Sequence, residues 1–103
     1  MRKITKENKI YELEDTNSFL CYYEEAYSIY IINIRSHKTG DAHLLIKELY
    51  KDYPNILFKV EVMKTKDRKR ALAFWKSEGF KKIKEYNAGF VSLIQMEKYN
   101  EKI

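Results

Sequence analysis

The residues best suited to chemistry lie where an apolar run meets an amphipathic one, in the segment Ile34-Arg35-Ser36-His37-Lys38-Thr39-Gly40-Asp41-Ala42. A basic, glycine-containing turn between a strand and a helix can present backbone N–H groups to an anion. The N-terminus of the helix adds partial positive charge. Gly40 permits close approach of the backbone, and Arg35, His37 and Lys38 supply charge, whereas Asp41 opposes a phosphate there. The segment indicates either a phosphate site or an ordinary strand-to-helix turn in which Asp41 favours the helix dipole.

A second basic cluster occupies residues 64–70, Lys-Thr-Lys-Asp-Arg-Lys-Arg, and again lies between a strand and a helix. In open α/β sheets, ligands bind beyond the carboxyl ends of parallel strands. Two basic turns at adjacent strand ends would therefore converge on one polyanionic ligand. The alternative is a solvated charged face, especially for Lys66 and Lys69.

The elements that must position these turns follow from hydrophobic periodicity. We expect strands at residues 9–14, 19–23, 27–35, 56–63, 81–86 and 90–96, and helices at residues 41–53 and 67–78. Apolar residues on both faces of 27–35 indicate a central strand. Thr39 is the expected N-cap of the first helix, Pro54 ends it, and Gly79 is suited to the left-handed residue after the second. Residues 87–89 are expected to form a hairpin turn, and residues 1–6 and those from 100 onward to be loose.

This β-β-β-α-β-α-β-β order predicts an α+β fold with a mixed sheet, in which the central strand, helix and strand form a right-handed parallel crossover. The chain has 103 residues and a net charge of +5, which fits one domain spanning residues 1–103. A single cysteine, Cys21, cannot form an internal disulfide, and no run approaches the ~20 apolar residues that span a bilayer. We therefore expect a cytoplasmic protein that does not contact a membrane.

Residues 71–80, Ala-Leu-Ala-Phe-Trp-Lys-Ser-Glu-Gly-Phe, resemble the late helix of the GCN5-related N-acetyltransferases, the GNAT superfamily. Residues 37–42 then fall on that family's phosphate loop, usually Gln/Arg-x-x-Gly-x-Gly/Ala. The resemblance covers about residues 27–98. It implies an acyl-CoA N-acyltransferase-like fold that lacks the two helices usually found between the first two strands.

The resemblance also implies a cofactor, acetyl-CoA or another acyl-CoA, held between the parallel strands 27–35 and 56–63. Backbone N–H groups from residues 37 to 42 would hold its pyrophosphate, and the backbone of Ile34 and Arg35 would meet its pantetheine. Arg68 could bind a phosphate and Phe74 could line the pantetheine channel. The implied cofactor-binding residues are Ile34, Arg35, His37, Lys38, Thr39, Gly40, Asp41, Ala42, Arg68 and Phe74.

For the base that deprotonates an amine acceptor, Glu61 is the first candidate, with Glu24 and Glu25 as alternatives. Carboxylates in such positions are more often surface groups than catalytic bases. The tyrosine that commonly protonates the departing thiolate falls on Trp75, and an indole N–H is not a useful acid. The proton would then come from water or one of the nine tyrosines. Cysteine and histidine show no zinc-type spacing, so no metal site is expected.

Three functions remain open. The first is acyl-CoA-dependent N-acylation of an amine, with a protein as one conceivable acceptor and a homodimer as one way to complete the site. The second is a catalytically inactive GNAT-like module that binds or inhibits a protein partner, as the tryptophan at position 75 suggests. The third is nucleic-acid binding through residues 64–70 and exposed tyrosines. Charge alone supports it, because no recognised nucleic-acid motif appears and the 15 acidic residues are interspersed with the 20 basic ones.

Overall fold

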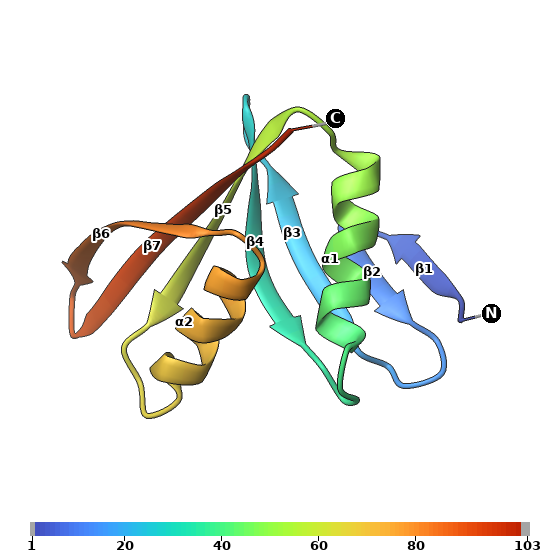
Figure 1. Cartoon of the computed structure of the whole chain (residues 1–103), viewed down its shortest axis with the longest axis horizontal. Coiled ribbons are helices and arrows are strands. Elements are labelled where there is room, and N and C mark those ends of the chain that lie inside the picture. The colour runs from blue at the N-terminus through green and yellow to red at the C-terminus, as the bar shows by residue number, and fades with distance from the viewer. Residues whose placement is uncertain (1, 102–103) are drawn as a thin grey trace.

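The computed structural model describes residues 2–101 as a seven-stranded sheet with two helices on one face (Figure 1). The helices are α1 (Asp41–Asp52) and α2 (Arg68–Ser77). The strands, in chain order, are β1 (Ile4–Glu7), β2 (Ile10–Leu13), β3 (Phe19–Glu24), β4 (Ser28–Arg35), β5 (Ile56–Met63), β6 (Lys81–Ala88) and β7 (Val91–Asn100).

The strand order in the sheet is β1-β2-β3-β4-β5-β7-β6. Only β4 and β5 are parallel, as expected for strands joined through a helix, and all other neighbours are antiparallel. The predicted mixed α+β sheet with β4 at its centre is confirmed. Both predicted helices are present within about one residue of their expected ends.

Four local expectations were wrong. Residues 4–7, predicted to be loose, form the edge strand β1, which the tight turn Asn8-Lys9 joins to β2. Two residues therefore connect the first two strands, and no helix lies between them. The last strand runs on to Asn100, whose side-chain amide donates to the carbonyls of Tyr50 and Tyr53 at 3.0 and 2.7 Å. The final hairpin turn is Gly89-Phe90 rather than residues 87–89.

The fourth correction concerns the first residue of α1. Gly40, with φ of +93°, is its N-cap, and no side chain caps the helix, so Thr39 does not have the predicted role. At the end of α2 the expectation is confirmed: Gly79 has φ of +93°, and the Phe80 N–H donates to the Trp75 carbonyl at 2.9 Å. The Phe80 ring then packs on the Trp75 ring, 4.9 Å between centroids.

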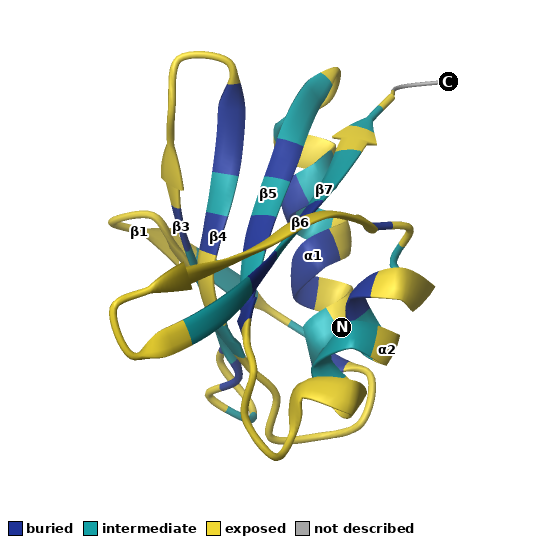
Figure 2. Cartoon of the chain, turned by 90° about the vertical axis from the view of Figure 1, so that its left-hand side faces the viewer, coloured by how far each residue is buried: buried dark blue, intermediate teal, exposed yellow. Residues whose placement is uncertain are grey.

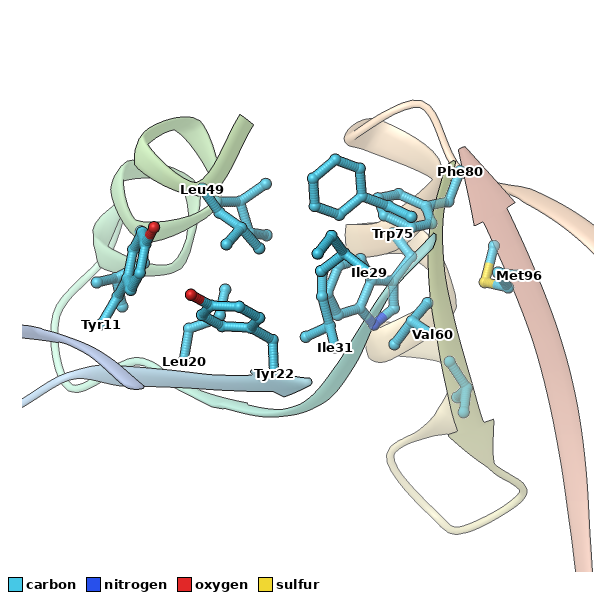
Figure 3. Close-up of a cluster of buried hydrophobic side chains, with 14 of the residues drawn as sticks. Tyr11, Leu20, Tyr22, Ile29, Ile31, Leu49, Val60, Trp75, Phe80 and Met96 are labelled. Carbon is cyan, nitrogen blue, oxygen red and sulfur yellow. The ribbon is translucent and has the colours of Figure 1, made fainter. Parts of the chain in front are cut away.

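The core lies between the sheet and the two helices. Figure 3 shows side chains of β2, β3, β4, β5 and β7 directed toward α1 and α2. Burying such side chains stabilises the fold by about 1.5–3 kcal/mol each. The fully buried members with the largest side chains are Phe58, Leu13, Leu20, Ile29, Ile31, Leu45, Ile46, Leu49 and Met96.

The opposite face of the sheet has no helix over it within residues 2–101, and β6 is exposed along its whole length (Figure 2). No helix of residues 2–101 is both long and apolar enough to cross a membrane.

Candidate functional site

A cleft opens in the middle of the sheet, where the parallel strands β4 and β5 separate. Their pairing runs from Ser28–Leu57 to Ile31–Val60 and ends there, although both strands continue. The two arrows diverge visibly in Figure 1. The resulting cleft has a volume of about 330 Å³ and is lined by Ile31, Ile32, Asn33, Ile34, Val60, Glu61, Val62, Met63, Thr65, Asp67, Arg68, Ala71 and Trp75.

The strands separate because each follows its outer neighbour. Beyond Ile31, β4 stays paired with β3 through an irregularity between Cys21 and Tyr22, while β5 stays paired with β7 as far as Met63–Leu93. The irregularity also places Ile34 on the same face of the sheet as its partner Leu20. On the cleft side, the backbone edges of residues 32–35 and 61–63 pair with no strand of residues 2–101. These edges can bind an extended ligand that contains amide groups.

A second hollow of about 290 Å³ extends the cleft toward α1. It shares Ile34, Asp67, Ala71 and Trp75 with the first and adds Ser36, Ala42, Arg70 and Phe74. The two hollows together form a path that leads from Glu61 on β5 to Ala42 in the first turn of α1. The path therefore joins a carboxylate at one end to a helix N-terminus at the other.

Backbone N–H groups are available where this path reaches α1. The amides of Lys38, Thr39, Gly40, Ala42 and His43 make no hydrogen bond within residues 2–101. Two neighbouring amides are already engaged: His37 donates to the Ser18 hydroxyl at 2.8 Å, and Asp41 donates to the Lys38 carbonyl at 3.1 Å. The unpaired amides and the helix dipole together suit an anion.

Asp41 does not face this anion position, despite its place in the loop. Its side chain is fully buried and accepts hydrogen bonds from Arg2, Thr16 and Ser18, each at 2.7 Å. The Arg2 guanidinium, followed by the two hydroxyls, holds the pKa of the Asp41 carboxyl well below its usual range. The charge that was expected to oppose a phosphate is therefore neutralised from the interior side of the loop.

The predicted basic residues take different positions. Arg68 lines the cleft and Arg70, outside the predicted set, lines the second hollow. Arg35, His37 and Lys38 are exposed and line neither. The Arg35 side chain projects on the face that carries Phe19, away from the helices. Of the predicted cofactor-binding side chains, the path thus brings together those of Ile34, Ala42, Arg68 and Phe74.

Glu61 lines the other end of the path. It is half-buried, the Tyr30 hydroxyl donates a hydrogen bond to its Oε1, and its Oε2 is buried with no hydrogen-bond partner in residues 2–101. Sequence reasoning did not select Tyr30. The available signal was the alternation of side chains along a strand. Tyr30 and Glu61 lie at positions that would share one face of two strands predicted to be parallel neighbours.

Trp75 is 5% exposed and forms one wall of both hollows. Its ring packs edge-on against Phe74 and Phe80, at 5.1 and 4.9 Å between centroids. Among residues 2–101, no three His, Cys, Asp or Glu side chains are grouped so that they could hold a metal ion. Cys21 is half-buried on the face away from the helices, and burial raises the pKa of its thiol.

The overall arrangement is similar to one solved enzyme, the ribosomal-protein-S18-alanine N-acetyltransferase from Escherichia coli. The TM-score is 0.73 with 15% sequence identity, and the match covers 95% of this chain and 74% of that one. This chain has a GNAT-like fold. At this identity the likeness shows the fold alone. No protein-family model and no curated protein sequence matches the chain.

The resemblance placed the cofactor between these two parallel strands, and the cleft lies between them. Two features differ from what the resemblance implied. Asn8 and Lys9 alone link the first two strands, and the buried Trp75 stands where the resemblance implied a tyrosine.

Proposed function

We propose that this protein binds an acyl-CoA in the path between β4 and β5 and transfers the acyl group to an amine. One observation supports this above all others. Two adjoining hollows, which share four lining residues, extend from Ala42 in the first turn of α1 to a half-buried carboxylate with an unpartnered oxygen. Unpaired amides surround Ala42 at one end, and the strand edges on either side lack backbone partners among residues 2–101.

The residues present fit such a ligand along its length. The amides of Lys38, Thr39, Gly40, Ala42 and His43 would hold the pyrophosphate, with Arg68 and Arg70 as nearby cations. The free edge of β4 at Ile34 and Arg35 would bond the amide groups of the pantetheine. Phe74 and Trp75 would cover its apolar carbons. An acyl-CoA supplies a thioester carbonyl that an amine can attack.

In this proposal Glu61 acts as the general base. Its Oε2 accepts a proton from the ammonium form of the acceptor, which gives the neutral amine that attacks. The strand edges and the loop contribute position, which favours the reaction by fixing its partners in place. As the C–N bond forms and the C–S bond breaks, the nitrogen gives up its second proton to water, and because Trp75 supplies no acid, water in turn protonates the departing thiolate.

The second candidate is a module that binds an acyl-CoA or a protein partner without catalysis. The observation in its favour is Trp75, whose buried indole lies at the position of the usual acid. The two functions differ in turnover, so a turnover assay separates them.

The first test is calorimetry and thermal unfolding with CoA and acetyl-CoA. We expect saturable binding, with a rise in the melting temperature of roughly 10 °C when the ligand exceeds its Kd about 100-fold. Gly40→Glu should abolish binding, because it places a carboxylate among the free amides.

Gly89→Glu is the matched control. Gly89 also has positive φ and, like Gly40, has no atom within 4 Å of the point where a Cβ would lie, but it belongs to the β6–β7 turn. The Gly89→Glu variant should bind CoA as the wild type does. No binding at millimolar CoA would refute the proposal. Release of free thiol from acetyl-CoA in the presence of amines, lost in Glu61→Gln, would favour the transferase over the inactive module.

A further inference from the structure

A group of side chains on the helix-free face of the sheet surrounds Glu61. The Tyr30 hydroxyl donates to Glu61 Oε1, and the Tyr30 ring stacks on Tyr23, with 5.0 Å between centroids and 18° between planes. Neither tyrosine belongs to the loop before α1 or to the basic turn before α2. The group comes from three adjacent strands, β3, β4 and β5.

Backbone register brings these residues together. Tyr30 pairs with Lys59 across the parallel strands, which places Glu61 two residues farther along on the same face. Tyr23 pairs directly with Tyr30 across the β3–β4 ladder. Glu61 is the first residue of β5 beyond the last β4–β5 pair, Ile31–Val60, so it stands at the point where the cleft begins.

Other charged and polar groups near Glu61 on this face have partners of their own. Lys59 Nζ lies 3.4 Å from Glu25 Oε2. Gln95 lies on β7, where it pairs with Glu61 of β5, and its side chain donates to Glu97 Oε2 at 2.8 Å. Among the described residues, the side chain that donates a hydrogen bond to the Glu61 carboxylate is thus that of Tyr30. The donated bond occupies Oε1 and leaves Oε2 without a partner among residues 2–101.

We infer that Tyr30 is a positioning residue for Glu61: its hydroxyl fixes Oε1, so that Oε2 stays unpartnered in the wall of the cleft and accepts a proton from the amine substrate that enters it. The inference rests on the proposed function and extends it, because it assigns the orientation of the base to a phenol on β4.

The test is a double-mutant cycle in turnover with acetyl-CoA and an amine. Glu61→Gln should lower kcat by ~10²-fold or more, the usual contribution of a general base. Tyr30→Phe keeps the stacked ring and removes only the hydroxyl. It should lower kcat roughly tenfold, the effect of one hydrogen bond, with the KM for acetyl-CoA unchanged. The double variant should be no slower than Glu61→Gln alone, because Tyr30 acts through Glu61.

Tyr23→Phe is the matched control, since it removes a hydroxyl from the other ring of the stack, one that contacts Glu25 at 3.3 Å. It should leave kcat unchanged. Full activity of Tyr30→Phe, or additive losses in the double variant, would overturn the inference while the transferase function stands. Absence of turnover in the wild-type protein would refute the transferase function and this inference together. The calorimetric test of CoA binding would still show whether the cleft binds the cofactor.

Discussion

The two strand-to-helix turns of this protein both contain basic residues, but they differ in the groups that they offer to a ligand. The first turn, residues 36–40, follows β4 and leads into α1. The second turn, residues 64–70, follows β5 and includes the first residues of α2. Both leave the carboxyl ends of the parallel pair. The first offers fixed backbone amides, whereas the second offers cationic side chains exposed to solvent.

The first turn is anchored from the interior. The Ser18 hydroxyl accepts the His37 N–H and donates to Asp41, and Arg2 neutralises the same carboxylate at 2.7 Å. Buried polar groups that are fully satisfied in this way hold a loop in a single conformation. The anchor keeps the outward amides of residues 38–40 free for a ligand.

The second turn has no such anchor among the described residues. Residues 63–70 are all exposed, and Asp67 at the N-cap of α2 makes no side-chain capping bond. Lys64 pairs with Glu85 on β6 at 2.6 Å, which leaves Arg68 and Arg70 facing the hollows. A turn can offer its backbone amides to a ligand when its acidic side chain is neutralised from the protein interior, and amino-acid composition alone does not reveal this.

The largest expected effect comes from breaking the anchor of the first turn. Arg2→Met keeps the apolar stem but leaves the Asp41 carboxylate buried without its cation, which is strongly unfavourable. We expect the melting temperature to fall by several degrees and the affinity for CoA to fall roughly tenfold or more, because the charge-assisted bond is lost. Thermal unfolding and calorimetry measure the two effects.

Lys3→Met is the matched control for that variant. Lys3 is exposed and lies 3.8 Å from Glu14, an ion pair that contributes little to stability. Equal melting temperatures for Arg2→Met and Lys3→Met would show that the anchor does not support the first turn.

A smaller effect is expected from Ser18→Ala, which removes the hydroxyl shared by His37 and Asp41 but leaves Arg2 in place. The affinity for CoA should fall roughly two- to tenfold, as for the loss of one hydrogen bond. The control is Ser77→Ala, whose hydroxyl donates only to the Phe74 carbonyl at the end of α2. If both variants bind CoA equally well, the anchor has no influence on the loop amides.

In the second turn, the double variant Arg68→Gln/Arg70→Gln should weaken CoA binding without lowering the melting temperature, since both side chains are exposed. We expect a loss of roughly two- to tenfold that shrinks as salt is raised, because exposed charges are screened. Lys66→Gln/Lys69→Gln removes the same charge from residues that line neither hollow. An equal loss in this control would mean that general surface charge, rather than the hollow, attracts the ligand.

The smallest effect should be the acid dependence of the second turn. Hydrogen bonds from Lys64 and then Lys82 lower the pKa of Glu85 to about 2. A carboxyl with a depressed pKa stabilises the fold above its unfolded pKa of ~4.3, and this contribution is lost as the pH falls through the folded value. The same sign applies to Asp41, whose pKa is also lowered.

Urea unfolding between about pH 5 and pH 2 can therefore compare the two turns. The wild-type protein should lose stability as the pH falls. Asp41→Asn should remove more of this pH dependence than Glu85→Gln, because Asp41 is fully buried while Glu85 and its lysines are partly exposed and screened. A larger effect of Glu85→Gln would reverse the ranking of the two turns.

The sequence by itself determined most of the elements and their order. Apolar periodicity located both helices and six of the strands, because a period of 3.6 or 2 is a local property of the chain. The apolar residues on both faces of residues 27–35 placed that strand at the centre of the sheet. Gly79 followed by Phe80 marked the end of α2. Each of these signals depends on residues within a few positions of one another.

Only the tertiary structure decided what the candidate site contains. The edge strand β1 has a polar sequence and is held by Lys6, whose ammonium bonds Glu48 and Asp52 on α1, more than 40 residues away. The inward orientation of Asp41 depends on Arg2, and the Tyr30–Glu61 contact depends on strand register. These contacts join segments that are far apart in the chain, so no local sequence pattern predicts them. They form only when the sheet assembles and the entropy cost of bringing the segments together has been met.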